Sequence, residues 1–193
     1  MAYIEFNMPL TSLDPNAALV VIDLQKGIVA LPAAQPPPEI VTRAAKLAQA
    51  FRQRGLPVVL VNVTAMAPGR IDSPRPKREF PPDWTELVPE LDRQPSDHLV
   101  TKQRYGAFLG TDLDAFLRKQ GVTQIFLAGI SSSAGVESTA RSAYDLGYHV
   151  VFVSDAITDP VLEAQQYCLT RVFPHLGEVD TTEAVLAKLE TRA

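Results

Sequence analysis

Runs of consecutive apolar residues recur along the chain. The run at residues 17–24 (AALVVIDL) and the run at residues 57–64 (PVVLVNVT) are apolar at almost every position. A short run without alternation is typical of a strand that is buried on both faces of a parallel sheet. Such runs predict five strands and a short sixth one at a sheet edge, over residues 17–24, 57–64, 98–102, 123–130, 148–154 and 177–179.

Between these runs, apolar residues recur every three or four positions, which is the spacing of a helix with one buried face. Helices are expected over residues 39–54, 112–120, 134–146, 159–172 and 181–191. Ser133 precedes the third of these helices and Thr181 begins the fifth. Both are expected to be N-cap residues, because a side-chain oxygen there accepts a hydrogen bond from a free backbone N–H group. Pro160 is suited to the first turn of the fourth helix.

The alternation of strands and helices predicts one α/β domain over residues 1–193. In such a domain, right-handed crossovers place helices on both faces of a parallel sheet. Residues 65–97 carry many prolines and no sustained period. We therefore expect a long surface segment there, with one or two helical turns at residues 84–91. Loops of this length inside a compact domain are usually functional or pack against a partner subunit.

Composition and charge exclude several classes of protein. A chain of 193 residues with 46% hydrophobic residues is long enough for one sizeable core and short for two. A net charge of −4 provides no basic surface for nucleic acid. No window approaches the roughly 18 consecutive apolar residues of a membrane span, and the N-terminus lacks the pattern of a signal peptide. We expect a cytoplasmic protein that contacts neither membrane nor nucleic acid.

Polar residues at the ends of the expected strands indicate a site. Ligands of open α/β sheets bind beyond the carboxyl ends of the strands, where the strand order reverses. Asp23 ends the first strand, Lys102 ends the third, and the segment 129–135 follows the fourth. Each residue alone is equally consistent with a structural role, Asp23 as a cap and Lys102 as a surface lysine. Together they place an acid and a base at neighbouring strand ends, where each perturbs the pKa of the other.

The sequence GISSSAGVESTAR at residues 129–141 places three serines between a buried strand and a helix. Backbone N–H groups at such a helix N-terminus suit a bound carboxylate or a developing oxyanion. Simple capping explains the same pattern and is compatible with a site. A serine nucleophile would also need a positioned base, so capping or ligand contact is the favoured role of these serines.

The sequence carries no metal signature, because His98, His149 and His175 are isolated and lack the paired spacing of a ligand set. We therefore expect no metal and no cofactor. The single cysteine, Cys168, excludes an intrachain disulfide. Its apolar neighbours on an expected helix favour a buried structural thiol.

Three segments resemble the motifs of the isochorismatase-like (cysteine hydrolase) superfamily, in the same order. VVIDLQ at residues 20–25 resembles its first motif, VTKQRYGAF at residues 100–108 its second, and GISSSAGVESTAR at residues 129–141 its third. SDA at residues 154–156 also lies where the family has a similar strand end. The resemblance covers nearly the whole chain.

This resemblance implies a three-layer fold in which helices cover both faces of a six-stranded parallel sheet, and a homo-oligomer, dimer or tetramer. It also implies an Asp–Lys–Cys triad, with Asp23 as the aspartate and Lys102 as the lysine. The family often has a cis peptide bond in the third motif, which would fall at Ile130–Ser131. Its oxyanion donors would be the backbone amides of Ser131 and Gly135.

The chain departs from this pattern at Gly135, where the family has its nucleophilic cysteine. Chemistry through a thioester therefore has no nucleophile, since Cys168 lies in a later helix. The true isochorismatases resemble this chain in having glycine there, and vinyl-ether hydrolysis needs only a proton donor and a water. By this resemblance a protonated Asp23 is the acid, and Lys102 and Arg104 hold substrate carboxylates. A tight Lys102 salt bridge would oppose that protonation, and the sequence leaves open which effect is larger.

The leading hypothesis is a metal-free hydrolase that acts on a small anionic or carbonyl-bearing metabolite without a covalent cysteine intermediate. Asp23 is then the general acid/base and Lys102 its electrostatic partner. The expected substrate contacts are Gln25, Arg104, Ser131 and Gly135. The alternative is a catalytically inactive ligand-binding or assembly protein on the same scaffold. A third hypothesis is that Gly135 is an engineered replacement.

Overall fold

Among the described residues, 9–72 and 80–191, the computed structural model contains one sheet of six parallel strands. The strand order is β3-β2-β1-β4-β5-β6, which places β1 and β4 at the centre. The strands are β1 (Ala17–Ile22), β2 (Val58–Val63), β3 (His98–Lys102), β4 (Gln124–Ile130), β5 (His149–Thr158) and β6 (Glu178–Asp180). The predicted six-stranded parallel sheet, with its short edge strand, is confirmed.

The two central strands explain the uninterrupted apolar runs of the sequence. Every residue of β1 and of β4 is buried. β1 pairs on both sides, so that Val20 lies opposite Val59 of β2 and Leu127 of β4. Successive side chains of a strand point to opposite faces, and both faces are covered here. A polar residue has no solvent-facing position along these strands.

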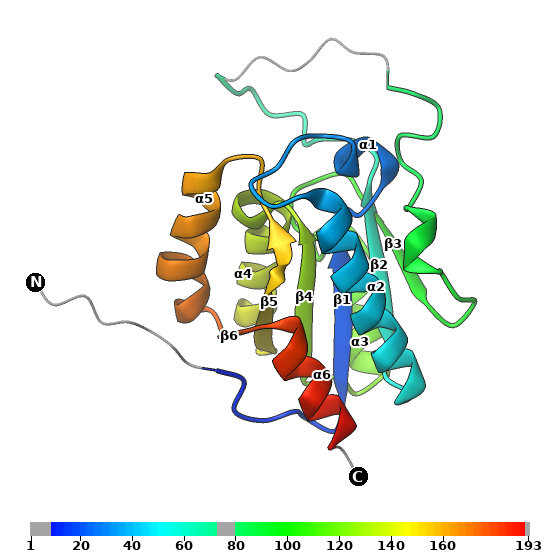
Figure 1. Ribbon diagram of the computed structural model, residues 1–193. Helices are drawn as coiled ribbons and strands as arrows, with labels where there is room; N and C mark the ends of the chain where they lie inside the picture. The colour runs from blue at the N-terminus through cyan, green and yellow to red at the C-terminus, as the bar shows by residue number, and fades with distance from the viewer. Residues whose placement is uncertain (1–8, 73–79, 192–193) are drawn as a thin grey trace, which may run out of the picture.

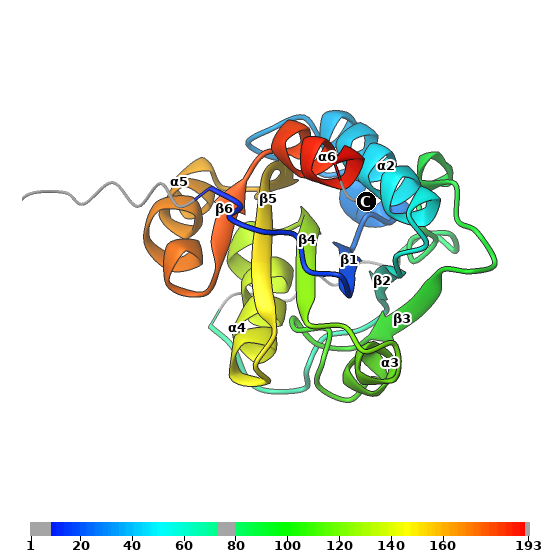
Figure 2. The same cartoon turned by 90° about the horizontal axis from the view of Figure 1, so that it is seen from below.

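Helices cover both faces of the sheet, as predicted (Figures 1 and 2). On one face lie α2 (Pro37–Gln53) and α6 (Thr182–Glu190), and on the other lie α3 (Leu113–Lys119) and α4 (Glu137–Asp145). The remaining helices of the described residues are α1 (Lys26–Val29), α5 (Leu162–Tyr167), the 3-10 helices η1 (Pro89–Leu91) and η4 (Phe173–His175), and the π-helices η2 (Ser132–Val136) and η3 (Cys168–Val172).

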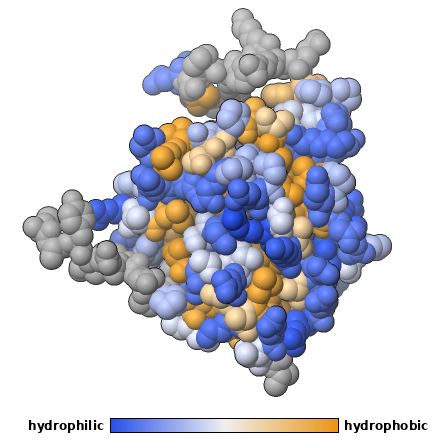
Figure 3. Space-filling model, viewed as in Figure 1, coloured by the Kyte–Doolittle hydropathy of each residue, from blue (hydrophilic) through white to orange (hydrophobic). Residues whose placement is uncertain are grey.

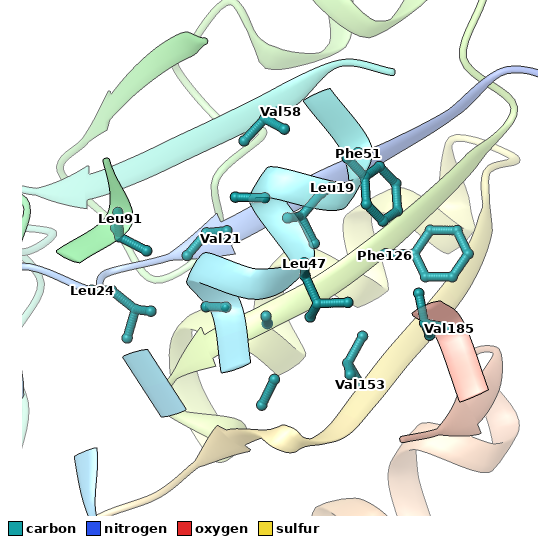
Figure 4. Close-up of a cluster of buried hydrophobic side chains, with 14 of the residues drawn as sticks. Leu19, Val21, Leu24, Leu47, Phe51, Val58, Leu91, Phe126, Val153 and Val185 are labelled. Carbon is teal, nitrogen blue, oxygen red and sulfur yellow. The ribbon is translucent and has the colours of Figure 1, made fainter. Parts of the chain in front are cut away.

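Large side chains fill the space between the sheet and each helical layer. Figure 4 shows the side of α2, where Leu47 and Phe51 lie over the sheet and Phe51 meets Phe126 edge to face, with ring centroids 5.3 Å apart. On the opposite face, Phe152 and Phe173 stack with centroids 3.9 Å apart. Each buried side chain of this size contributes about 2–3 kcal/mol to folding. The two clusters hold the central strands in place and thereby fix their carboxyl ends.

β5 is longer than the sequence predicts. Its register with β4 changes between Leu127 and Gly129, and the strand continues to Thr158. Asp159 therefore lies at its carboxyl end. Because the strand takes up these residues, Pro160 lies before α5 rather than in its first turn, and that prediction is wrong. Hydrophobic patterning does not reveal irregular pairing, since the polar residues in the middle of β5 imitate a strand end.

The N-cap predictions meet different outcomes. Thr181 caps α6, because its side chain accepts a hydrogen bond from the backbone N–H group of Ala184. Ser133 does not cap the helix after β4, because its hydroxyl donates to Asp159 instead. The helical segment begins earlier, as η2, and Ser131 occupies the N-cap position without a side-chain cap bond.

In the described part of the segment between β2 and β3, residues 80–88 (the Trp84 segment) lie beside α1 at the carboxyl ends of the strands (Figure 1). Backbone hydrogen bonds attach it there, from Lys26 N to Glu86 O at 2.8 Å and from Gly27 N to Trp84 O at 3.1 Å. The indole of Trp84 lies directly against Gly27, so that a Cβ atom there would overlap the ring. The predicted helical turn is present as η1, and residues 73–79 of the segment lie outside the described part.

Apolar and hydrophilic residues are interspersed on the face seen in Figure 3. Several large apolar side chains are exposed, among them Leu109 and Tyr167. Within the described residues, no helix combines the length and the apolar composition that crossing a membrane requires.

Candidate active site

The strand order reverses between β1 and β4, since the chain leaves β1 toward β2 and leaves β4 toward β5. Asp23 directly follows β1, and the turn over residues 131–135 directly follows β4. Lys102 ends β3, two strands away from β1, yet its side chain reaches Asp23. The three features that the sequence singles out therefore meet at the carboxyl edge of the sheet.

Asp23 is held in a buried and conformationally restricted position. Its backbone N–H group donates to Val61 O at 2.9 Å, and its φ angle of 54° lies in the left-handed region. Aspartate tolerates this region better than most residues. Asp23 Oδ2 accepts a hydrogen bond of 2.7 Å from Lys102 Nζ, while the buried Oδ1 has no hydrogen-bond partner. An unpaired carboxylate oxygen in a buried site is costly.

Burial decides the protonation of Asp23. It raises the pKa of this carboxyl to about 6, although the charge of Lys102 and its hydrogen bond both act to lower it. The sequence left open whether burial or the salt bridge is the larger effect, and burial is larger. Near neutral pH the group therefore exchanges a proton readily, as a general acid or base must.

Gly135 lies directly beside this carboxyl group. A Cβ atom at Gly135 would lie 3.2 Å from Asp23 Oδ2 and 2.9 Å from Ile22 Cγ2. A side chain at this position would thus point at Asp23, and the absence of one leaves only backbone there. The peptide bond between Ile130 and Ser131 is cis, as the resemblance implies.

The three serines of the turn have different surroundings. The carbonyl of Ser131 accepts hydrogen bonds from Ala134 N at 3.2 Å and from Val136 N at 3.0 Å, which closes the first turn of η2. Ser132 is fully buried, and its hydroxyl has no hydrogen-bond partner. Ser133 is exposed and is held by Asp159. The roles of the Ser131 and Gly135 amides as anion donors stay predictions.

Gln25 is buried and uses its amide to join three backbone segments. Its Nε2 donates to Val63 O and to Trp84 O, each at 3.1 Å, and its Oε1 accepts from Val63 N at 2.7 Å. Gln25 therefore ties the end of β2 and the Trp84 segment to the start of α1. Gln25 lies two residues after Asp23 in the chain, and its side-chain amide is taken up by these backbone partners.

Arg104 follows Lys102 on the surface of the site. Its carbonyl oxygen accepts a second hydrogen bond from Lys102 Nζ, at 3.1 Å. Its guanidinium group is exposed and lies against Gly110. The carbonyl group of Arg104 thus helps to orient the Lys102 side chain, while the Arg104 guanidinium group lies near Gly110 rather than at Asp23.

Two polar residues that the sequence did not single out support the turn. The hydroxyl of Thr139 donates to Gly135 O at 2.6 Å and accepts from Ala107 N at 3.1 Å, so it joins the segment after β3 to the segment after β4. Asp159 Oδ2 accepts from both Ser133 N and Ser133 Oγ. The sequence shows only that these two residues are polar. The structure shows that both are buried, and buried polar groups need a hydrogen-bond partner.

The cysteine is separate from this chemistry. Cys168 is buried in η3, and its thiol contacts Glu137 Oε2 at 3.5 Å. Burial, followed by the charge of Glu137, raises the pKa of the thiol to about 12, so a thiolate nucleophile does not form near neutral pH. The predicted buried structural thiol is confirmed. In the part of the chain that is described, no three His, Cys, Asp or Glu side chains are placed to hold a metal ion.

Comparison with known sequences identifies the same domain. The model of the isochorismatase domain matches residues 17–184. The isochorismatase family protein YwoC of Bacillus subtilis is 41% identical over 183 residues, which cover 91% of this chain and 95% of YwoC.

Solved structures agree with this match. An isochorismatase family protein from Burkholderia thailandensis is 45% identical and superposes with a TM-score of 0.90, over 96% of this chain and all of that one. N-carbamoylsarcosine amidase from Thermoplasma acidophilum is 30% identical, with a TM-score of 0.71 over 87% of this chain and 97% of the amidase.

Proposed function

The chain belongs to the isochorismatase family, and from this premise we propose that it hydrolyses a small anionic or carbonyl-bearing metabolite without a covalent nucleophile. Asp23 is the general acid/base of this reaction. The observation that carries the proposal is the buried Asp23 carboxyl group, with one oxygen bound by Lys102, the other unpaired, and a pKa raised to about 6.

The proposed chemistry follows from the two forms of this carboxyl group. Protonated Asp23 gives its proton to the substrate, and a water molecule adds to the carbon that becomes electron-poor. Asp23, now a carboxylate, takes the proton that the water releases, so the group ends in its starting form. The hydrated intermediate then breaks its bond between that carbon and the leaving oxygen or nitrogen, and its hydroxyl proton passes to the leaving group as the carbonyl product forms. Gly135 supports attack by water rather than by a protein nucleophile, because it has no side chain to attack the substrate. The same glycine is the basis for placing the chain in a subgroup that lacks the catalytic cysteine.

The neighbouring residues have supporting roles. Lys102 keeps one Asp23 oxygen fixed, so that proton exchange takes place at the unpaired Oδ1. The backbone amides of Ser131 and Gly135, at the start of a helical segment, suit a substrate carboxylate or an oxyanion. Arg104 is exposed and able to turn toward a second anionic group of the substrate. Gln25 acts through the backbone segments it holds.

A screen of purified protein tests the proposal. The panel contains vinyl ethers that bear carboxylates, ureides and amides, and the ureides are included because a structural relative is an N-carbamoylsarcosine amidase. Asp23→Asn is expected to lower kcat/KM for the best substrate by about 10²–10⁴-fold, which is the usual contribution of general acid/base catalysis. Asp145→Asn, at an exposed position at the end of α4, is the matched control. Unchanged turnover in Asp23→Asn would contradict the assignment.

A ligand-binding protein without catalysis is the second candidate, favoured by Gly135, which offers no nucleophile. It predicts thermal-shift responses to members of the same panel without hydrolysis, and responses that survive the loss of Asp23. Hydrolysis of any member by the wild type, abolished in Asp23→Asn, excludes it.

A cytoplasmic homo-oligomer, dimer or tetramer, belongs to the same proposal. Exposed apolar side chains, among them Val161, Leu162 and Tyr167, support self-association because they gain from burial. Light scattering on the purified protein measures the mass of the assembly, and a monomer over the micromolar range would contradict this part.

A further inference from the structure

Asp159 is a buried carboxylate that the proposed chemistry does not use. Only 2% of the residue is exposed, and it directly follows β5, on the same edge of the sheet as Asp23. Its Oδ2 accepts two hydrogen bonds from Ser133, from the backbone N at 2.8 Å and from Oγ at 2.7 Å. Its Oδ1 accepts a third from Val161 N at 3.0 Å.

The backbone around Asp159 holds a third segment. Its carbonyl oxygen accepts from Ala34 N at 2.8 Å, and the hydroxyl of the preceding Thr158 accepts from Gln35 N at 2.9 Å. A residue that only capped the turn before α5 would need Oδ1 alone. The use of Oδ2 and of the carbonyl shows that Asp159 joins this turn to the segment before α2 and to the turn after β4.

We propose that Asp159 is a positioning residue, which holds Ser133 and thereby sets the path of the turn over residues 131–135 beside Asp23. The inference rests on the proposed function, since it gives Asp159 the task of fixing the backbone amides of Ser131 and Gly135, which that function assigns to anion binding. Ser133 lies midway between these two residues, so anchoring its N–H group and its hydroxyl on one rigid oxygen anchors both neighbours.

The charge and symmetry of a carboxylate are what this arrangement needs. Both Oδ atoms of Asp159 face donors, Ser133 on one side and the N–H group of Val161 on the other. Asparagine has the same shape, but one of its two ends is an NH₂ group. In either orientation this group meets a backbone N–H, so Asp159→Asn loses one side of the junction without losing volume.

The strand itself supplies a matched control. Asp155, earlier in β5, also accepts from one backbone N and one hydroxyl, those of Thr182, at 2.7 and 2.8 Å. These bonds hold the start of α6 and not the turn. The other oxygen of Asp155, Oδ2, faces Arg43 Nε at 3.5 Å. Both oxygens of Asp155 therefore face donors, so Asp155→Asn also loses one side of its contacts, and it leaves the turn intact.

The test compares wild type, Asp159→Asn and Asp155→Asn by NMR. The first readout is amide hydrogen exchange and peak position for residues 131–136 in the ligand-free protein. The second is the affinity of the turn for acetate, used as a carboxylate probe. Asp159→Asn is expected to speed exchange in the turn and to weaken acetate binding, each by about tenfold, the effect of one lost charge-assisted hydrogen bond. Asp155→Asn is expected to change exchange at the start of α6 and to keep acetate affinity within about twofold.

If Asp159→Asn keeps the exchange rates and the acetate affinity of the wild type, while its Tm falls as in Asp155→Asn, Asp159 is only a cap and the proposal is overturned. A wild type without any acetate response in the turn would count against the anion-binding part of the proposed function. The exchange comparison still decides on Asp159 in that case, because faster exchange confined to the turn supports positioning and unchanged exchange overturns it.

Discussion

At the scale of single residues, Asp23 combines the most unfavourable features for a packed residue. Its carboxyl group is buried, restricted by a positive φ angle and bound by Lys102, yet one oxygen is left without a partner. A group maintained at such cost is typical of a functional position rather than of a packing solution. Asp155 differs from Asp23, because its Oδ1 accepts hydrogen bonds from the backbone N and the hydroxyl of Thr182, the first residue of α6.

The raised pKa of Asp23 predicts how stability changes with pH. A carboxyl group whose pKa is about 6 when folded, against 3.8 as its ordinary value, binds its proton more tightly in the folded state. Its favourable contribution is complete below about pH 4 and is lost as the pH rises through 6. The free energy of unfolding of the wild type, measured in urea, is therefore expected to fall by about 2.5 kcal/mol relative to Asp23→Asn between pH 4 and pH 7. A difference that does not depend on pH would show that the pKa is ordinary.

The packing around Gly135 predicts the effect of adding one methyl group. In Gly135→Ala the new Cβ would approach Ile22 Cγ2 to 2.9 Å, and Ile22 is fixed in the fully buried β1. Overpacking of this kind costs about 1–3 kcal/mol, while alanine regains about 1 kcal/mol of helix propensity. A net loss of up to about 2 kcal/mol in the free energy of unfolding is expected.

Gly69→Ala serves as the control for this substitution, because no atom lies within 4 Å of its Cβ position. Its effect is expected to stay within about 0.5 kcal/mol. Equal stabilities of the two variants would mean that the space beside Asp23 is not closed around a glycine.

At the scale of elements, the central strands were predictable and the irregular ones were not. β1 and β4 are buried at each residue, so their sequences carry an unmistakable apolar run. The end of β5 carries no such signal, because its irregular pairing brings half-buried Ser154 and Asp155 into the strand. The same irregularity hid Asp159. Long-range partners of this kind depend on tertiary structure, which a local pattern does not contain.

The residues of the candidate site also fall into a group that the sequence predicts and a group that it does not. Strand ends and a serine-rich turn are local features, so the positions of Asp23, Lys102 and Gly135 followed from the order of elements. The hydrogen bonds from Gln25 to Val63 and Trp84 join segments that are distant in sequence. The local sequence around Gln25 does not predict them.

The anchoring of the Trp84 segment through Gln25 predicts a local loss of order. Gln25→Leu removes the amide that bonds the N–H and carbonyl groups of Val63, and it leaves the carbonyl of Trp84 with Gly27 N as its remaining donor. Each buried group that loses its partner costs about 1–3 kcal/mol. We expect a loss of about 2–4 kcal/mol in the free energy of unfolding and faster proteolysis between residues 80 and 88.

Gln53→Leu is the matched control, since Gln53 is exposed at the end of α2. It is expected to change neither quantity appreciably. Proteolysis of the Trp84 segment at the wild-type rate in Gln25→Leu would contradict the anchoring role.

At the scale of the whole molecule, the fold explains why one small edge carries the site. Both helical layers and both apolar clusters serve to hold six parallel strands with their carboxyl ends together. Open α/β sheets bind ligands beside such a reversal of strand order, and the Trp84 segment lies with α1 at this edge (Figure 1). The family supplies this frame, and the chemistry depends on a few residues added to it.

The pH dependence of kcat/KM, measured on the best substrate of the hydrolysis screen, tests the central claim that Asp23 acts as the acid. The account predicts a rate that falls above about pH 6, the pKa of the free enzyme's acid. It also predicts that Asp23→Asn loses both this dependence and at least about 100-fold of the rate. A wild-type profile without an ionisation near pH 6, or the same profile in Asp23→Asn, would contradict it.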